Sequence, residues 1–180
     1  MNELNPSLID TTVQIRRPVD GGADVLRQFS ASFDYHGDRG TEEIGQVHGW
    51  IGWSILEEDV ADAGDAISFD AAQLGAAAAE IIDTHFDDFI DAALLIDRMY
   101  LEPVWRGRRL SGAIINSLMA LLRLDPGSTA VVLQPEPQRP EGGPYEDGPE
   151  RDEAMARLHA AYRVSGLEPW RDSLVWWRPF

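Results

Sequence analysis

The chain has 180 residues, enough for one domain with a hydrophobic core, and 44% of them are hydrophobic, which favours a folded globule over a disordered chain. Its 31 acidic residues against 15 basic ones give a formal net charge of −16, so we expect neither nucleic acid nor an anionic membrane surface among its partners. The absence of cysteine excludes disulfides, thiolate metal sites and a cysteine nucleophile.

The N-terminal residues Met1–Asp10 are polar and lack the basic and apolar regions of a signal peptide. No apolar stretch is long enough to span a bilayer, so we expect a cytoplasmic protein. Lysine is also absent, and the basic residues other than histidine are all arginine, a bias that indicates a GC-rich, bacterial genome.

In chain order, alternating apolar and polar residues first predict three strands, at Thr11–Arg17, Val25–Tyr35 and Glu43–Leu56. The turn Gly37-Asp38-Arg39-Gly40 joins the last two as an antiparallel hairpin. Asp59–Asp70 is expected to be an acidic loop, and the alanine-rich segment Ala71–Asp83 a helix.

The second half of the chain alternates between strands and helices. We predict a buried strand Ala92–Leu101, a helix Ser111–Leu124, a buried strand Thr129–Leu133, a mobile loop Gln134–Glu150 rich in proline, glycine and acid, a helix Glu150–Val164 and a last strand within Leu174–Arg178. The strand–helix–strand unit in the centre should have parallel strands. The whole chain, 1–180, is therefore predicted to be a single α/β (α+β) domain, a mixed sheet with helices on its faces.

Arginines and glycines cluster after the buried strand, in the segment Asp97–Ala113. A strand end, a turn and a helix start follow one another here, and the free amides and positive dipole end of that helix suit an anion such as a pyrophosphate. Arg106, Arg108 and Arg109 reverse the local charge of a strongly acidic protein. The alternative is that these arginines pair with the chain's many carboxylates.

This segment resembles the acetyl-CoA motif of the GNAT acetyltransferase superfamily, in which Arg-x-x-Gly-x-Gly/Ala opens a helix after a strand that ends in proline. Arg106 matches the first position, Arg109 stands at the expected glycine, and Ser111 at the expected glycine or alanine. The segment Tyr162–Leu167 resembles the family's Tyr-x-x-x-Gly-Phe near the last helix. The order of the elements also fits the family, so the resemblance covers most of the chain.

The resemblance implies a GNAT-like, mostly antiparallel sheet flanked by helices and an acetyl-CoA-dependent N-acetyltransferase. In the family, the strand before the turn splays from its neighbour and its backbone pairs with the pantetheine arm, a role that would involve Met99, Tyr100 and Leu101. The backbone amides of the turn hold the pyrophosphate, which implies Arg106, Gly107, Arg108, Arg109, Leu110, Ser111 and Gly112. The tyrosine at the position of Tyr162 protonates the departing thiolate.

Two features depart from the family's pattern. Arg109 places a side chain where phosphate approaches the backbone, so it either crowds the cofactor or points outward and engages a phosphate. Only a few residues separate Arg17 from Val25, where the family has helices that help form the acceptor pocket. The helix Ala71–Asp83 would have to supply that wall.

Acyl transfer to an amine needs a base, an oxyanion donor and an acid. Asp97, in an apolar strand, is the first candidate base because burial would raise its pKa, and Glu102 is the second. The alternative for Asp97 is a pairing with Arg98 or a helix N-terminus, and for Tyr162 it is packing of the ring in the core. Trp50 or Trp53 could line an acceptor pocket.

We expect no metal. The four histidines lack metal-ligand spacing, and the acids Asp83, Asp87, Asp88 and Asp91 lack the pattern of a calcium loop.

The resemblance thus implies transfer of an acetyl group from acetyl-CoA to a primary amine of a small molecule or peptide. The charge and position of the acidic loop Gln134–Glu150 predict a lid that attracts a cationic acceptor. A homodimer is one possible assembly. The alternative is a non-catalytic module that binds an acyl-CoA or a protein partner.

Overall fold

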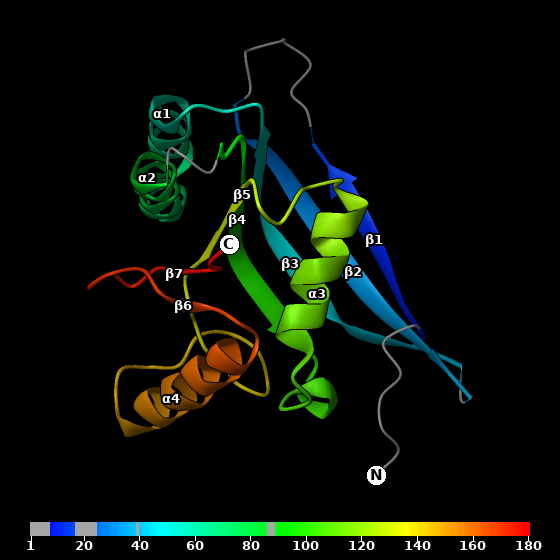
Figure 1. Cartoon of the computed structure of the whole chain (residues 1–180). Helices are drawn as coiled ribbons and strands as arrows, with labels where there is room; N and C mark the ends of the chain where they lie inside the picture. Colours follow the sequence, from blue (N-terminus) through cyan, green and yellow to red (C-terminus); the bar gives the residue numbers. More distant parts are fainter. Residues whose placement is uncertain (1–7, 17–24, 39, 86–88) are drawn as a thin grey trace.

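The computed structural model describes residues 8–16, 25–38, 40–85 and 89–180 (Figure 1). These form one seven-stranded sheet in the order β1-β2-β3-β4-β5-β7-β6. Its strands are β1 (Ile9–Ile15), β2 (Arg27–Gly37), β3 (Gly40–Trp53), β4 (Ala92–Leu101), β5 (Thr129–Leu133), β6 (Glu168–Pro169) and β7 (Trp176–Trp177). Only β4 and β5 pair in parallel, so the predicted mixed α+β sheet and its central parallel unit are confirmed.

Helices cover both faces of the sheet. Figure 1 shows α1 (Glu57–Ile67) and α2 (Phe69–Thr84) on one side, α3 (Leu110–Leu121) on the other, and α4 (Pro149–Val164) at the end of the sheet near β6 and β7. A short 3-10 helix, η3 (Pro103–Trp105), lies between β4 and α3. Among the described residues, no helix combines the length and the apolar character needed to cross a membrane.

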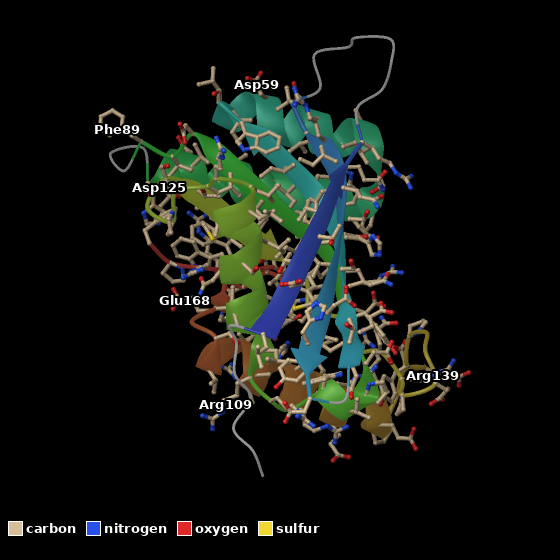
Figure 2. All side chains as sticks on the ribbon, turned by 90° about the vertical axis from the view of Figure 1, so that its right-hand side faces the viewer. Asp59, Phe89, Arg109, Asp125, Arg139 and Glu168 are labelled. Carbon is tan, nitrogen blue, oxygen red and sulfur yellow. The ribbon has the colours of Figure 1, made fainter. Side chains whose placement is uncertain are left out.

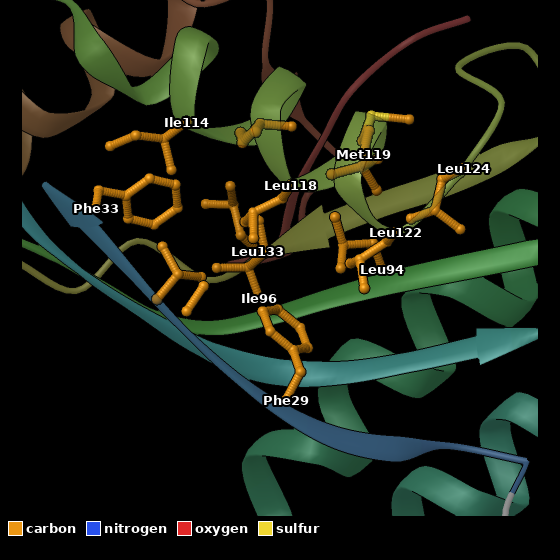
Figure 3. Close-up of a cluster of buried hydrophobic side chains, with 14 of the residues drawn as sticks. Phe29, Phe33, Leu94, Ile96, Ile114, Leu118, Met119, Leu122, Leu124 and Leu133 are labelled. Carbon is orange, nitrogen blue, oxygen red and sulfur yellow. The ribbon is translucent and has the colours of Figure 1, made fainter. Parts of the chain in front are cut away.

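An apolar cluster fills the space between the sheet and α3. Phe29, Phe33, Leu94 and Ile96 of the sheet meet Ile114, Leu118 and Met119 of α3 (Figure 3). Residues of α3 three and four positions apart share one helix face, which is why this apolar stretch folds as a helix against the sheet.

A second cluster lies under α1 and α2 on the other face of the sheet. Ala93 and Leu95 of β4 join it, whereas Leu94 and Ile96 belong to the first cluster, as the alternation of side chains along a strand requires. Both faces of β4 are therefore buried at this point, in agreement with the predicted buried strand.

The prediction of an acidic loop at Asp59–Asp70 is wrong, because α1 occupies most of it. Val60 and Gly64, four residues apart, face α2, and a Cβ atom on Gly64 would lie 2.5 Å from the carbonyl oxygen of Ala71. Acidic residues surround this narrow apolar stripe in the sequence, so the periodic pattern of a helix is not evident there. Ser68 separates the two helices, and its hydroxyl accepts a hydrogen bond from the amide of Ala71 at 3.2 Å.

The other differences concern boundaries. The strand at Ala92–Leu101 and the strand at Thr129–Leu133 have the predicted limits. Helix α3 stops before the predicted Leu124 because Arg123 adopts φ 56° and reverses the chain. The last predicted strand is reduced to β7, and β6 was not predicted. Arg17 lies outside the described residues.

Candidate ligand-binding site

The strands β4 and β5 separate halfway along β4. Their parallel pairing runs from Ala92 with Thr129 to Ile96 with Leu133, where β5 ends, whereas β4 continues to Leu101 alongside β3 alone. The register with β3 shifts at the same point: His48 pairs with Arg98 and Gly49 with Ile96, which leaves Asp97 as the extra residue of a β-bulge.

Gly49 is required at this bulge. A Cβ atom at this position would lie 2.0 Å from the carbonyl oxygen of Leu95, so any side chain would push the two strands apart. The close approach of β3 and β4 at the bulge therefore depends on this glycine. On the other edge of β4, the segment beyond Ile96 has no partner strand among the described residues.

A cavity of about 530 Å³ lies beside this unpaired half of β4. Its walls come from the end of β4, the following turn, the start of α3, the loop after β5 and α4. Of the predicted cofactor-binding residues it contains Met99, Tyr100, Leu101, Arg106, Gly107, Arg109, Leu110 and Ser111. The structure thus brings together two motifs that lie about 50 residues apart, since Tyr162 of α4 also lines this cavity.

Two predicted cofactor-binding residues lie outside the cavity lining. The guanidinium of Arg108 lies 4.7 Å above the ring of Trp105, and its Nε donates to the carbonyl oxygen of Val104 at 3.1 Å. Gly112 faces α4, where a Cβ atom would lie 3.4 Å from Cβ of Ser165. Gly112 therefore serves the approach of α3 to α4.

Arg106 joins the turn to the loop after β5. Its Nε donates to the carbonyl oxygen of Leu101 at 2.8 Å, and its Nη1 donates to that of Gln138 at 3.1 Å. Its guanidinium lies 5.2 Å from the ring centre of Tyr100, while Nη2 is buried and has no partner among the described residues. A buried, unpaired donor of a cation is costly unless a ligand meets it.

The arginines of the turn do not pair with carboxylates of the described residues. Arg106 and Arg108 use backbone carbonyl oxygens, and Arg109 makes no ion pair there. The alternative in which these arginines neutralise the chain's own acids is therefore not realised in the described part of the chain.

Helix α3 begins at the cavity with its first amides uncapped. Arg109 precedes it in the left-handed conformation, at φ 60° and ψ 36°, and no side chain caps the helix. Gly107 also has a positive φ of 73°. The side chain of Arg109 is exposed and lies at the periphery of the molecule (Figure 2). Its guanidinium therefore leaves the first amides of α3 open to an anion.

Tyr162 is buried, yet its hydroxyl is available. The side chain is 4% exposed, and its ring packs edge-on against Trp176 with 6.0 Å between the centres. No described residue makes a hydrogen bond to the hydroxyl, although the residue lines the cavity. Burial raises the pKa of Tyr162 above its ordinary value, so the hydroxyl is protonated at neutral pH and is a weaker acid than an exposed tyrosine.

The candidate bases Asp97 and Glu102 lie outside the cavity lining. Desolvation raises the pKa of Asp97, with Asp70 and Glu136 adding to the rise and Arg98 and His48 opposing it. Asp97 forms no ion pair among the described residues, so the salt bridge with Arg98, one of its two predicted alternatives, is not formed there.

Glu102 has a structural task. Its amide donates to the carbonyl oxygen of Ile44 at 2.8 Å, and its carbonyl oxygen accepts from the amide of Trp105 at 2.8 Å. The residue thus ends β4 and starts η3.

The loop after β5 supplies the residues that the sequence did not reveal. Glu136, Gln138 and Tyr145 line the cavity, as do Arg157, Leu158 and Ala161 of α4. The loop is less irregular than its composition predicts, since Gln138 pairs with Pro144 and the amide of Arg139 donates to the carbonyl oxygen of Gly143 at 2.9 Å. The parallel pairing of β4 and β5 was the available signal, because it places the segments after both strands at one edge of the sheet.

Comparisons with known proteins add no relative. No protein-family model matches the chain, and neither the curated proteins nor the solved structures gave a match.

Other predicted features lie away from the cavity. Trp50 is buried under α2, and Trp53 lies beneath Arg27, so neither lines the cavity. The described residues contain no group of three or more histidines and acids that could hold a metal ion. Asp87 and Asp88 lie outside the described residues.

The site therefore combines four features in one space: an unpaired strand edge, the open amides of a helix start, an arginine with a free buried donor, and a protonated tyrosine. The first can pair with an extended polar chain, the next two with an anion, and the last with a group that gains negative charge.

Proposed function

We propose that the chain is a GNAT-like N-acetyltransferase that binds acetyl-CoA in this cavity and transfers the acetyl group to a primary amine. The observation that carries the proposal is the loss of β5 from β4 where the cavity opens beside α3, with Tyr162, whose hydroxyl has no hydrogen-bond partner among the described residues, lining the same space. The cavity volume of about 530 Å³ falls within the range of small-molecule sites.

Two parts of acetyl-CoA, the pantetheine arm and the pyrophosphate, have a matching element in the cavity. The pantetheine arm carries amides, which can pair with the backbone edge of Met99–Leu101 that has no partner strand, where the carbonyl oxygen of Leu101 already accepts from Nε of Arg106. The pyrophosphate is an anion that suits the first amides of α3, with Nη2 of Arg106 and the guanidinium of Arg109 as donors. Both arginines lack carboxylate partners among the described residues, which leaves their charge for such a ligand.

In the proposed reaction the neutral amine attacks the thioester carbonyl carbon. The N–C bond forms and the C–S bond breaks, Tyr162 gives its proton to the departing sulfur, and a base takes the proton that the nitrogen loses. Asp97 is the proposed base, acting through water because it lies outside the cavity lining. Desolvation raises its pKa and makes its carboxylate a better proton acceptor.

A second function is favoured by the position of the candidate bases. Neither Asp97 nor Glu102 lines the cavity, and Arg109 adopts a backbone conformation that favours glycine. A module that binds an acyl-CoA without turnover, or uses the same surface for a protein partner, would have no need of a base in the cavity.

Calorimetric titration with acetyl-CoA, followed by a thiol-release assay with a panel of primary amines, separates the two. Binding together with release of CoA supports the acetyltransferase. Binding without release for any amine supports the non-catalytic module. A chain that does not bind acetyl-CoA contradicts both.

A further inference from the structure

The cavity carries charges of opposite sign. Arg106, Arg109 and Arg157 are its cations, and Glu136 is the one carboxylate among the described lining residues. Arg157 is paired with Glu153, its Nη1 lying 2.6 Å from a carboxylate oxygen, whereas Glu136 has no ion pair in the described part of the chain. If the arginines face an anion, Glu136 offers a place for a cation in the same cavity.

The backbone holds Glu136 in a fixed position. Pro135 and Pro137 flank it, and both are buried. Proline fixes its own φ and confines the residue before it to extended conformations, so the backbone of Glu136 has little freedom. One residue beyond Pro137, the carbonyl oxygen of Gln138 accepts from Nη1 of Arg106 at 3.1 Å, which ties this segment to the turn before α3. Such rigidity is typical of a residue that is placed for a ligand.

Two further groups of the proposed reaction are related to Glu136. Tyr162, a buried side chain whose hydroxyl has no partner among the described residues, lines the same cavity. Asp97 does not line the cavity, but it lies close enough to Glu136 for this carboxylate to contribute to the raised pKa of Asp97. Glu136 is therefore a lining residue that also lies near the proposed base.

We propose that Glu136 binds a positive charge of the acceptor and that the acceptor is a diamine or a similarly dicationic amine. The inference rests on the proposed acetyl transfer. A carboxylate stabilises the ammonium form of any amine it binds, so an amine held by Glu136 through its only nitrogen would stay protonated and unreactive. A second amine leaves one ammonium on Glu136 while the other loses its proton and attacks.

The test is the binding of 1,4-diaminobutane to the full chain saturated with CoA, measured by calorimetry. Both glutamates are exposed residues of the same loop, and only Glu136 lines the cavity: Glu136→Gln removes its charge at nearly constant shape, and Glu146→Gln removes a charge outside the cavity lining. We expect roughly tenfold weaker diamine binding in Glu136→Gln, as for a partly solvated ion pair, and unchanged binding in Glu146→Gln.

Butylamine has the same four-carbon chain as the diamine but a single charge. Comparison of the two ligands therefore shows how much of the diamine's affinity comes from its second ammonium group. The unaltered protein should bind the diamine several-fold more tightly than butylamine, and this preference should disappear in Glu136→Gln. Equal affinity of the diamine for the unaltered protein and Glu136→Gln overturns the inference, as does a preference that survives the substitution or a CoA-saturated chain that binds no diamine.

Acetyl-CoA affinity is measured on the same samples and keeps the two proposals apart. If all variants bind acetyl-CoA and only the role of Glu136 fails, the acetyltransferase proposal stands. If acetyl-CoA does not bind, the acetyltransferase proposal fails, and a diamine affinity that still depends on Glu136 in the protein without CoA would keep the cation site alone.

Discussion

The two halves of β4 differ although they belong to one strand. Ala92–Ile96 has β3 on one side and β5 on the other, and all five of these residues are buried. Met99–Leu101 has β3 alone and borders the cavity with partly exposed side chains. The bulge at Asp97 separates them.

This difference shows how one strand can serve both stability and a site. The first half contributes apolar side chains to clusters on both faces of the sheet, so its residues are constrained by packing. The second half keeps a free backbone edge that a ligand can use. We therefore expect substitutions in the first half to change the free energy of unfolding, and substitutions around the second half to change ligand binding or turnover.

The largest expected effect is on stability in the paired half. Leu95 is fully buried at 0% exposure, so Leu95→Ala should lower the free energy of unfolding by about 2–5 kcal/mol. Met99 is partly exposed at the cavity, so Met99→Ala should lower the free energy of unfolding by less than half of that value. Urea denaturation of both variants measures the difference. Equal losses would mean that the two halves do not differ in packing.

Removal of the Tyr162 hydroxyl should have the next largest effect. Tyr162→Phe keeps the ring against Trp176 and should lower kcat about a hundredfold without changing the affinity for acetyl-CoA. Steady-state kinetics by thiol release and calorimetric titration give the two quantities. An unchanged kcat would remove the proton-donor role, and the unfolding free energy of the variant serves as the control for packing.

Loss of the two hydrogen bonds by which Arg106 joins the turn to the loop after β5 should have an intermediate effect on acetyl-CoA binding. Arg106→Lys cannot reach the carbonyl oxygens of Leu101 and Gln138 with the same planar group, and it loses the free Nη2 donor, so acetyl-CoA binding should weaken about tenfold. Arg108→Lys, outside the cavity lining, is the matched control and should bind as the unaltered protein does. Equal weakening in both variants would mean that the hydrogen bonds of Arg106 have no special part in acetyl-CoA binding.

The smallest expected effect concerns the pH dependence of stability. Desolvation raises the pKa of Asp97 above its ordinary value of 3.8, so the folded chain holds this proton more tightly than the unfolded chain. Stability is therefore lost as pH rises through the folded-state pKa, and the ionised carboxylate costs stability at neutral pH. Asp97→Asn should be more stable than the unaltered protein at pH 7, and this gain should shrink as pH falls toward 3.8. A gain that is constant with pH would contradict this account.

Much of the fold could be predicted from local patterns. The buried runs Ala92–Leu101 and Thr129–Leu133 are apolar and bounded by turn residues, and their limits were predicted correctly. Helix α1 was missed because its acidic residues outnumber the stripe of Val60 and Gly64 that packs on α2. Its stability comes from tertiary contact, which the local sequence does not express.

The site could be predicted in the two segments that resemble the family's motifs, around Arg106 and around Tyr162. The turn from Arg106 to Ser111 is continuous in the sequence, and most of it lines the cavity. Glu136 and Arg157 come from a loop and a helix that approach the turn only because β5 lies parallel to β4. Asp97 was predicted to be the catalytic base, but it lies at the β-bulge and outside the cavity lining. A bulge could not be predicted here because it leaves no periodic pattern in the sequence.

The central claim is that the space beside the unpaired half of β4 binds acetyl-CoA. Ala161 lines this cavity, whereas Ala156 is an exposed residue of the same helix, α4, outside the lining. Calorimetric titration of Ala161→Trp and Ala156→Trp with acetyl-CoA tests the claim, because the two variants add the same bulk at the two positions. We predict that Ala161→Trp loses at least a hundredfold in affinity while Ala156→Trp binds as the unaltered protein does. Equal affinity in both variants would contradict the account.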